Sequence, residues 1–251
     1  MKVVVIGGSG LIGSNLVGML REKGAEVIPA SPSTGVNAVT GEGLAEVLTG
    51  AQVVVDVTNS PSFEDNVVME FFQASTRNLL AAVTAAGVGH YVALSVVGTE
   101  RMLESGYFRA KMAQEKMIVA SGLAYTIVRA TQFFEFMTSI ANASSDGQQV
   151  RLPSAKLQPV AAVDVAKVLA DVVLAKPVNG QVEVAGPDKE PLYRLVEQVL
   201  RANQDARAVV RDDQASYFGV MINDRSLTPD EDALIGALRL DQWLAKVAVA
   251  A

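Results

Sequence analysis

Ser95, Tyr107 and Lys111 are residues of the types that move a proton to or from a substrate oxygen. Tyr107 and Lys111 lie four residues apart in the segment ESGYFRAK, so on a helix their side chains share one face. A free tyrosine has a pKa of about 10, and a nearby ammonium favours the phenolate and lowers that pKa. We therefore expect Ser95 to hydrogen-bond the substrate oxygen and Tyr107 to protonate it, with Lys111 assisting. The Tyr-x-x-x-Lys spacing alone is weak evidence for catalysis in a chain with five tyrosines. The elements around it must show whether these residues lie at a catalytic site.

The first fifteen residues, MKVVVIGGSGLIGSN, place a glycine-rich turn between an apolar strand and a helix. Gly7, Gly10 and Gly13 form the pattern G-x-x-G-x-x-G. Glycine is needed where the backbone turns tightly and approaches a pyrophosphate, whose charge then lies at the helix N-terminus. A glycine-rich turn without a ligand is the alternative, but the strand–turn–helix context favours a dinucleotide. We expect its contacts to include these glycines with Leu11 and Ile12, and its nicotinamide ribose to be held by Lys111.

The end of the second expected strand bears on which dinucleotide binds. An NAD site usually has a carboxylate about 20 residues after the glycines, but the segment PASPSTG and its neighbours contain none. A carboxylate there would repel a 2′-phosphate, so NADP(H) is favoured over NAD(H), with Ser31 and Ser33 as hydrogen-bond donors. The usual cationic partner is missing, because no Arg or Lys lies between Lys23 and Arg77.

Two further groups of residues follow strand ends. Thr58 and Asn59 come after VVVDV and lie against the adenosine half of the dinucleotide, or else form a turn with Asn in a left-handed conformation. The aromatic cluster in the segment QFFEFM is explained equally well by an apolar substrate pocket and by core packing. The residues expected to line such a pocket are Gln132, Phe133, Phe136 and Tyr217. Tyr217 and its neighbour Phe218 either close the pocket or anchor the C-terminal lobe.

Short, uniformly apolar strands alternate with helices along the chain, which indicates a parallel sheet covered on both faces. The expected strands cover residues 2–6, 26–30, 36–39, 52–57, 90–96, 124–130, 150–152 and 181–185. The expected helices cover residues 11–23, 43–48, 64–86, 104–121, 163–174 and 192–201, with a final helix in the tail. Ser95 then falls at the carboxyl end of a central strand, where parallel sheets place ligand-facing residues. The predicted class is α/β, a Rossmann-type doubly wound parallel sheet over residues 1–155 with a smaller C-terminal substrate lobe, interleaved with it, over residues 156–251.

Composition excludes several classes of function. The 251 residues carry a net charge of −6 with no cluster of Lys or Arg, so nucleic-acid binding is not expected. There is no cysteine and only one histidine, His90, which excludes zinc–thiolate sites, thiol nucleophiles and histidine-rich metal sites. The apolar run at the N-terminus is too short for a signal peptide or a membrane span. We expect a cytoplasmic protein that binds a small-molecule substrate, no metal and no membrane.

Several stretches of the chain, in this order, resemble the short-chain dehydrogenase/reductase superfamily, and more closely its atypical, NmrA-like branch. They are VVVIGGSGLIGSNLV, GVNAVTGEGLAEVLTGAQVVVDVTN, TRNLLAAVTAAGVGHYVALSVVG, YFRAKMAQEKMIVASGLAYTIVRATQFFEF and PVAAVDVAKVL, which span roughly residues 1–175. The resemblance implies a Rossmann fold, NADP(H) and a C-terminal lobe that forms the substrate pocket. It maps the family's glycine loop to Gly7, Gly10 and Gly13, its strand-end serine to Ser95, and its Tyr-x-x-x-Lys to Tyr107 and Lys111.

Two departures from this pattern concern the cofactor. The helix between the second and third strands is missing, and so is the basic residue at the 2′-phosphate site. The expected function is an NADP(H)-dependent oxidoreductase that transfers hydride to a carbonyl or quinone in an apolar pocket. The alternatives are a non-catalytic NADP(H)-binding redox sensor and, with less support, a sugar-nucleotide epimerase.

Overall fold

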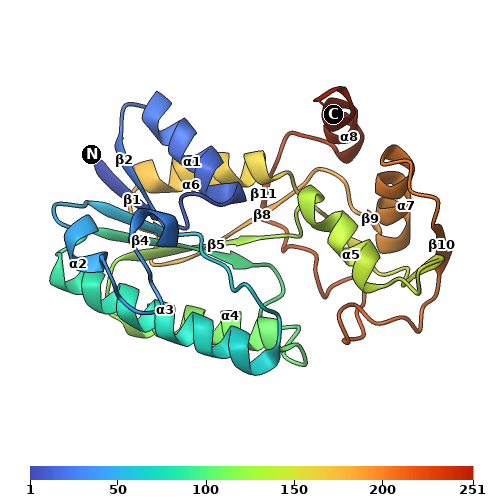
Figure 1. Cartoon of the computed structure of the whole chain (residues 1–251), viewed down its shortest axis with the longest axis horizontal. Helices are drawn as coiled ribbons and strands as arrows, with labels where there is room; N and C mark the ends of the chain where they lie inside the picture. Colours follow the sequence, from blue (N-terminus) through green and yellow to red (C-terminus); the bar gives the residue numbers. More distant parts are fainter. Residues whose placement is uncertain (251) are drawn as a thin grey trace. The chain divides into compact units, whose positions relative to one another are not determined.

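The computed structural model describes residues 1–250, which fold around a seven-stranded parallel sheet with helices on both faces (Figure 1). The strand order is β11-β8-β5-β4-β3-β1-β2. These strands are β1 (Lys2–Ile6), β2 (Glu26–Ala30), β3 (Val53–Asp56), β4 (His90–Val96), β5 (Tyr125–Ala130), β8 (Gly180–Ala185) and β11 (Leu234–Ile235). Because β1 lies between β3 and β2, the order reverses beside it, and the carboxyl ends of these strands form the usual ligand-binding crevice of such sheets. The predicted Rossmann-type fold class is confirmed.

Helices cover the two faces of this sheet. Figure 1 shows α1 (Leu11–Glu22) and α6 (Ala162–Leu174) on one face, with α3 (Asp65–Ala85) and α4 (Gly106–Ala120) on the other. The short α2 (Leu44–Val47) precedes β3. Strands buried on both faces are mainly apolar, as are VVVI in β1 and VVV in β3, where only the terminal Asp56 is polar.

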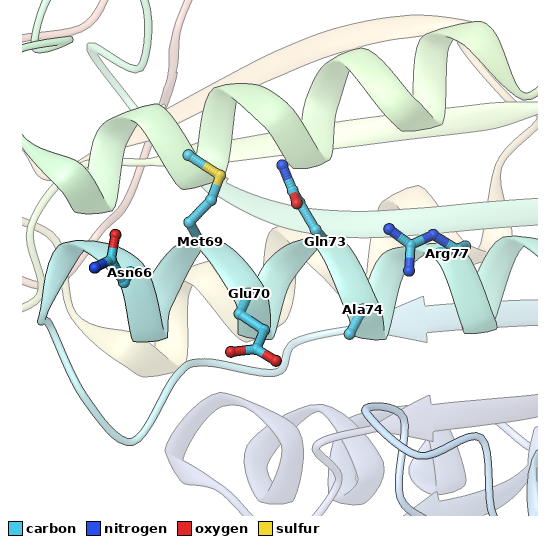
Figure 2. Close-up of a pocket in the computed structure, with 6 residues that line it drawn as sticks. All are labelled: Asn66, Met69, Glu70, Gln73, Ala74 and Arg77. Atoms are coloured by element: carbon cyan, nitrogen blue, oxygen red, sulfur yellow. The ribbon is translucent and has the colours of Figure 1, made fainter.

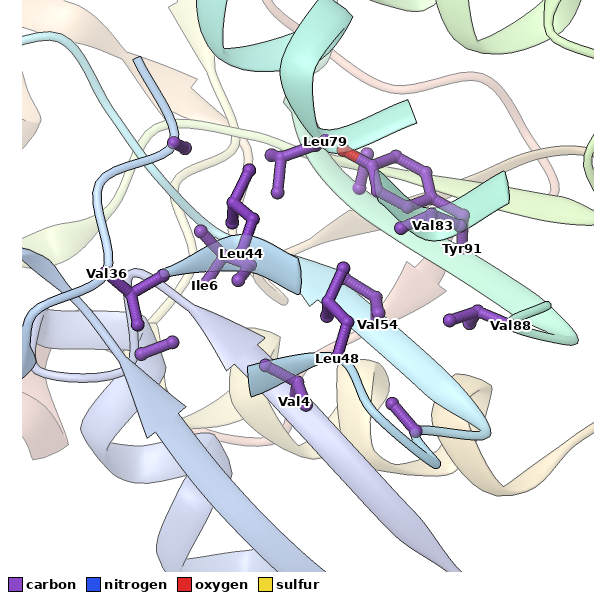
Figure 3. Packing of buried hydrophobic residues seen from close by; sticks show 14 of the residues in the cluster. Val4, Ile6, Val36, Leu44, Leu48, Val54, Leu79, Val83, Val88 and Tyr91 are labelled. Atoms are coloured by element: carbon purple, nitrogen blue, oxygen red, sulfur yellow. The ribbon is translucent and has the colours of Figure 1, made fainter. Parts of the chain in front are cut away.

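One part of the core lies between the sheet and the helices α2 and α3 (Figure 3). It contains Val4, Ile6 and Val54 of the sheet, Leu44 and Leu48 of the α2 region, and Leu79 and Val83 of α3, together with Val36, Val88 and Tyr91. These side chains are at most 8% exposed. Removing their apolar surface from water, at about 25 cal/mol per Å², is what holds the glycine-loop end of β1 in place.

The strand predicted at residues 36–39 is wrong. This segment is a loop in which Val36 and Ala38 are buried, but its backbone makes no ladder. Asn37 pairs only with Glu42 in an isolated bridge, and the Asn78 amide of α3 donates to the carbonyl oxygens of Ala38 (3.0 Å) and Val39 (2.7 Å). Val36 and Ala38 are therefore buried because the loop docks onto α3, and not because they lie on one face of a β-strand.

The chain divides into two compact units. The first comprises Met1–Arg129 and Val165–Val182, and the second comprises Ala130–Asp164 and the chain from Glu183 onward. We predicted a first domain over residues 1–155 and a lobe interleaved with it. The boundaries between the two compact units follow Arg129, Asp164 and Val182.

The second unit holds the remaining elements. After the 3-10 turn η2 (Phe134–Phe136) comes α5 (Met137–Ala143), which packs against α7 (Leu192–Ala202). Two small sheets pair β6 (Gln149–Leu152) with β10 (Ala208–Arg211), and β7 (Lys156–Leu157) with β9 (Glu190–Pro191). The last helix is α8 (Leu240–Ala250).

Candidate functional site

The glycine loop connects β1 to α1 and is shaped by close backbone contacts. Gly7 has a φ of +84°, which favours glycine, and the amides of Gly7 and Gly8 both donate to the carbonyl oxygen of Ala30 (2.8 and 3.3 Å). A Cβ at Gly13 would lie 2.2 Å from the Gly7 carbonyl oxygen. The glycine at position 13 is therefore required by the packing of α1 against the loop.

Gly10 differs from the other glycines of the loop, because the protein itself leaves room for a side chain there. A Cβ at Gly10 would meet only the Gly7 carbonyl oxygen, at 3.4 Å, and the residue is exposed at the N-cap of α1. Among the described residues, no side chain caps this helix end, and its first turn holds no acidic residue. The free N–H groups of the first turn and the open space above Gly10 fit a pyrophosphate.

The predicted ribose-phosphate residues meet at the end of β2. Ser31 is buried, and its hydroxyl shares a 2.8 Å hydrogen bond with the exposed Ser33 hydroxyl. Thr34 is exposed too, but its hydroxyl is engaged by the backbone, because it accepts from the Ser31 amide and donates to the Ser31 carbonyl oxygen, both at 2.9 Å. The structure thus brings Ser31 and Ser33 together and leaves Ser33 accessible.

The loop after β3 is anchored by Asp56, a buried carboxylate. Its Oδ1 accepts from the amide (3.0 Å) and the hydroxyl (2.7 Å) of Thr58. Its Oδ2 accepts from the Tyr91 hydroxyl and the Gln114 amide, both at 3.1 Å. The Thr58 side chain, expected at the adenosine, is therefore turned back onto Asp56, whereas the neighbouring Asn59 is exposed.

Ser95 lies at the carboxyl end of β4, as predicted, but its hydroxyl is hydrogen-bonded within the protein. Ser95 Oγ donates to Glu115 Oε1 of α4 at 2.5 Å. The same carboxylate accepts two hydrogen bonds from Arg129, from Nε at 3.0 Å and from Nη2 at 2.6 Å. Arg129 and Glu115 thus form a buried ion pair. Sequence reasoning missed Glu115, although it is four residues beyond Lys111 and so shares its helix face.

Tyr107 and Lys111 share a face of α4, as their spacing predicted, and both lie against Phe72 of α3. The Tyr107 and Phe72 ring centroids are 6.1 Å apart, and Lys111 Nζ is 4.4 Å from the Phe72 centroid. Lys111 is only 2% exposed, and its Nζ donates to the Leu94 carbonyl oxygen (2.8 Å) and to Gln114 Oε1. Two of the three N–H donors of the ammonium are thus used within the protein, and the third is left for the ribose contact expected of Lys111.

Burial dominates the electrostatics of this pair. It lowers the pKa of Lys111 to about 8, although the nearby charges of Asp56 and Glu115 act in the opposite direction. Tyr107 packs among aromatic rings, including Phe63 at 5.5 Å between centroids, and its burial raises the pKa of the phenol to about 12. The lowering that we expected from the ammonium is not found, because desolvation outweighs it.

The lowered pKa of Lys111 predicts a distinctive dependence of stability on pH. Lysine in the unfolded chain keeps its proton to about pH 10.5, whereas folded Lys111 releases it near pH 8. The unfolded state therefore binds more protons in this window, so the free energy of unfolding should rise with pH, by up to about 3 kcal/mol for this group. Above about pH 10 the raised pKa of Tyr107 has the opposite effect, because the folded protein then holds the extra proton.

Urea unfolding of Lys111→Met across this range provides the measurement. The substitution should remove the rise between about pH 8 and pH 10. Lys116→Met, on the exposed side of the same helix, should retain it. An unchanged rise in Lys111→Met would assign the effect to another group.

The predicted pocket residues lie in the second unit, where an aromatic group joins two of them. Phe136 and Phe218 stack with centroids 5.9 Å apart, and Tyr217 meets Phe218 edge-to-face at 4.9 Å. Gln132 is 7% exposed, and its buried Oε1 has no hydrogen-bond partner among the described residues. Phe133 forms a backbone bridge with Val160. The structure thus brings Phe136 and Tyr217 together through Phe218.

A shallow hollow of about 280 Å³ lies elsewhere, on the outer side of α3 (Figure 2). It is lined by Asn66, Met69, Glu70, Gln73, Ala74 and Arg77, all on that one helix. None of the predicted cofactor or catalytic residues lines it, so we assign it no part in the site. In the described part of the chain no helix is both long and apolar enough to cross a bilayer, and no three His, Asp or Glu side chains are grouped to hold a metal ion.

Similar proteins agree with this geometry. Residues 7–176, from the glycine loop to the segment after α6, match the model of a family described as NAD(P)H-binding. Over 238 residues the chain is 28% identical to divinyl chlorophyllide a 8-vinyl-reductase, chloroplastic, of Cucumis sativus, which covers 78% of this chain and 57% of the reductase. Over 149 residues it is 24% identical to photosystem II assembly factor Ycf39 of Cyanophora paradoxa, covering 54% and 46% of the two chains. The chain thus spans about half the length of these curated relatives.

Solved structures share the fold at low identity. MoeE5 in complex with UDP-glucose and NAD has a TM-score of 0.78 at 17% identity, over 99% of this chain and 98% of the other. A short-chain dehydrogenase/reductase superfamily protein from Agrobacterium tumefaciens with bound NAD has a TM-score of 0.76 at 15% identity, over 100% and 97% of the chains. The chain belongs to the NAD(P)H-binding family, and it shares the fold of these short-chain dehydrogenase/reductase-like structures.

Proposed function

We propose that this chain is an NAD(P)H-dependent reductase that transfers hydride to a carbonyl or quinone. The observation that supports cofactor binding is the uncapped, open start of α1 at Gly10, where a pyrophosphate can approach the free backbone N–H groups. When bound, the dihydronicotinamide supplies the hydride. The name of the relative from Cucumis sativus is that of a reductase, which supports reduction over epimerisation.

We further propose that NADP(H) is preferred over NAD(H). The accessible end of β2 presents the Ser33 hydroxyl, hydrogen-bonded to Ser31, and no carboxylate that would repel a 2′-phosphate. Titration of the protein with NADPH and with NADH separates the two cofactors. Tighter binding of NADH would reject the preference without touching the reductase assignment.

Among the acceptors, the environment of Tyr107 favours a quinone. Its phenol is fully protonated near neutral pH, and burial among aromatic rings disfavours the phenolate that would remain after it gave up its proton. A quinone that takes up hydride becomes a hydroquinone anion, which solvent can protonate. A ketone or aldehyde becomes an alkoxide, which needs a positioned acid far more.

Tyr107→Phe tests this assignment. For quinones the variant should keep its turnover within about two-fold, while any reduction of ketones or aldehydes should fall by about 100-fold or more. The measurement is anaerobic oxidation of NADPH and NADH with a panel of quinones, ketones and aldehydes. A large loss with quinones as well would make Tyr107 the proton donor for both classes.

A second candidate is binding of the cofactor without turnover, as in a redox sensor. It is favoured by the engagement of Ser95 with Glu115 and of Lys111 with Leu94 and Gln114, since both expected catalytic groups are satisfied by protein partners. Tight cofactor binding with no oxidation of NAD(P)H by any acceptor of the panel would support the sensor and overturn the reductase.

A further inference from the structure

The segment Tyr217–Val220 forms a tight turn with an unusual residue at its tip. Tyr217 and Val220 exchange backbone hydrogen bonds of 2.8 and 3.1 Å across the turn. The two central residues, Phe218 and Gly219, have φ values of +48° and +83°. Positive φ at both positions is the pattern of a type I′ turn, for which Asn-Gly, Asp-Gly and Gly-Gly are the favoured pairs.

Phenylalanine is a poor choice for the first of these positions. Its Cβ crowds the backbone in the left-handed region, where bulky residues are outliers. Burial of the ring does not offset this strain well, because Phe218 remains 44% exposed. Asparagine in its place would adopt the left-handed conformation more easily and would be solvated. The stability of the turn therefore does not explain why an aromatic residue stands here.

The ring of Phe218 is nevertheless held firmly in place. One side stacks on Phe136, with an interplanar angle of 21°, and the buried Tyr217 meets it edge-to-face at 84°. A strained turn that displays a braced, half-exposed apolar ring is typical of a residue kept for binding rather than for folding. The surface offered is flat and uncharged.

We propose that Phe218 determines substrate specificity, with its exposed ring stacking on the planar conjugated ring of a quinone. This inference rests on the proposed function and names the acceptor class. A quinone suits the surface because its ring is flat and electron-poor, whereas the face of a phenylalanine ring is electron-rich. A small aliphatic ketone presents no such ring and gains nothing from Phe218.

Phe218→Asn separates binding from folding. The Asn-Gly pair relieves the backbone strain, so Tm should rise by about 2 °C, while the dissociation constant and KM for quinones should increase by about ten-fold. The dissociation constant of NADPH should stay unchanged. Phe218→Tyr should retain the quinone affinity of the wild type, because it keeps the aromatic ring. Met221→Ala removes another apolar side chain, 53% exposed, just beyond the turn and should change neither quantity.

Direct binding of a quinone, measured by calorimetry, keeps this inference distinct from the proposed activity. A quinone that binds the wild type in a Phe218-dependent way without turnover would support the inference and reject the reductase. Turnover of quinones with an unchanged KM in Phe218→Asn would reject the inference alone. A fall in Tm on the same substitution would identify the ring as a packing anchor, and absence of quinone binding to the wild type would also overturn the proposal.

Discussion

Gly13→Ala should abolish cofactor binding and destabilise the first unit. The added Cβ would lie 2.2 Å from the Gly7 carbonyl oxygen and 2.7 Å from the Gly8 Cα, both backbone atoms that cannot move alone. The loop or α1 must shift, and such overpacking costs about 1–3 kcal/mol. Because the same loop must approach the pyrophosphate, we expect affinity for NAD(P)H to fall by about 100-fold or more, equivalent to about 2.7 kcal/mol. Fluorescence titration with NADPH and urea unfolding measure the two effects.

Two other glycines serve as matched controls for this substitution. Gly10→Ala meets only one atom, at 3.4 Å, so Tm should hold while affinity for NAD(P)H falls about as far as in Gly13→Ala. Gly18→Ala, farther along α1 with no atom within 4 Å, should leave affinity unchanged and stabilise the helix by about 0.5–1 kcal/mol. Unaltered affinity in Gly10→Ala would contradict the placement of the pyrophosphate at this helix end.

Arg129→Met should cost about 3–5 kcal/mol of stability, because it strands the buried Glu115 carboxylate without its partner. Both side chains of this pair are only 7% exposed, and the shortest contact is 2.6 Å. This loss of stability should be large only when Arg129 alone is replaced. Replacing both residues with methionine removes the stranded charge, so Arg129→Met/Glu115→Met should regain most of the stability.

The exposed pair of Lys23 and Asp171 provides the comparison. Its side chains are 44% and 60% exposed, and Lys23→Ala should cost no more than about 1 kcal/mol. Urea unfolding of the variants gives the free energies. If Arg129→Met costs as little as Lys23→Ala, the pair is weaker than its burial implies.

Much of the fold of the first unit could be predicted from sequence, where burial and backbone pattern agree. The apolar run HYVALSV, preceded by glycines at 87 and 89, gave β4 with its observed bounds. The segment at residues 36–39 misled because two buried side chains at alternate positions are also what a loop shows when it docks on a helix. Backbone hydrogen bonds distinguish a strand from a loop, and the pattern of hydrophobic side chains does not reveal them.

For the candidate site, the sequence predicted which element carries each residue but not the surroundings of the side chains. The spacing of Tyr107 and Lys111 placed them on one face of α4, yet periodicity alone does not say how deeply that face is buried. Phe72, far away in sequence on α3, packs against both side chains and contributes to their desolvation. The shifts in their pKa values therefore come from tertiary packing, which no local motif contains.

The division of the chain into two units also affects the order in which the parts of the first unit become available during synthesis. The first unit includes the stretch Val165–Val182, which a ribosome makes only after all of Ala130–Asp164. At about 5–20 residues per second, the delay between Arg129 and Val182 is roughly 3–10 s. During that interval the sheet lacks α6, whose Val165, Leu169 and Val173 are almost fully buried in the finished protein. We therefore expect the nascent chain to pass through a stage at which the apolar surface that α6 later covers is exposed and prone to aggregation.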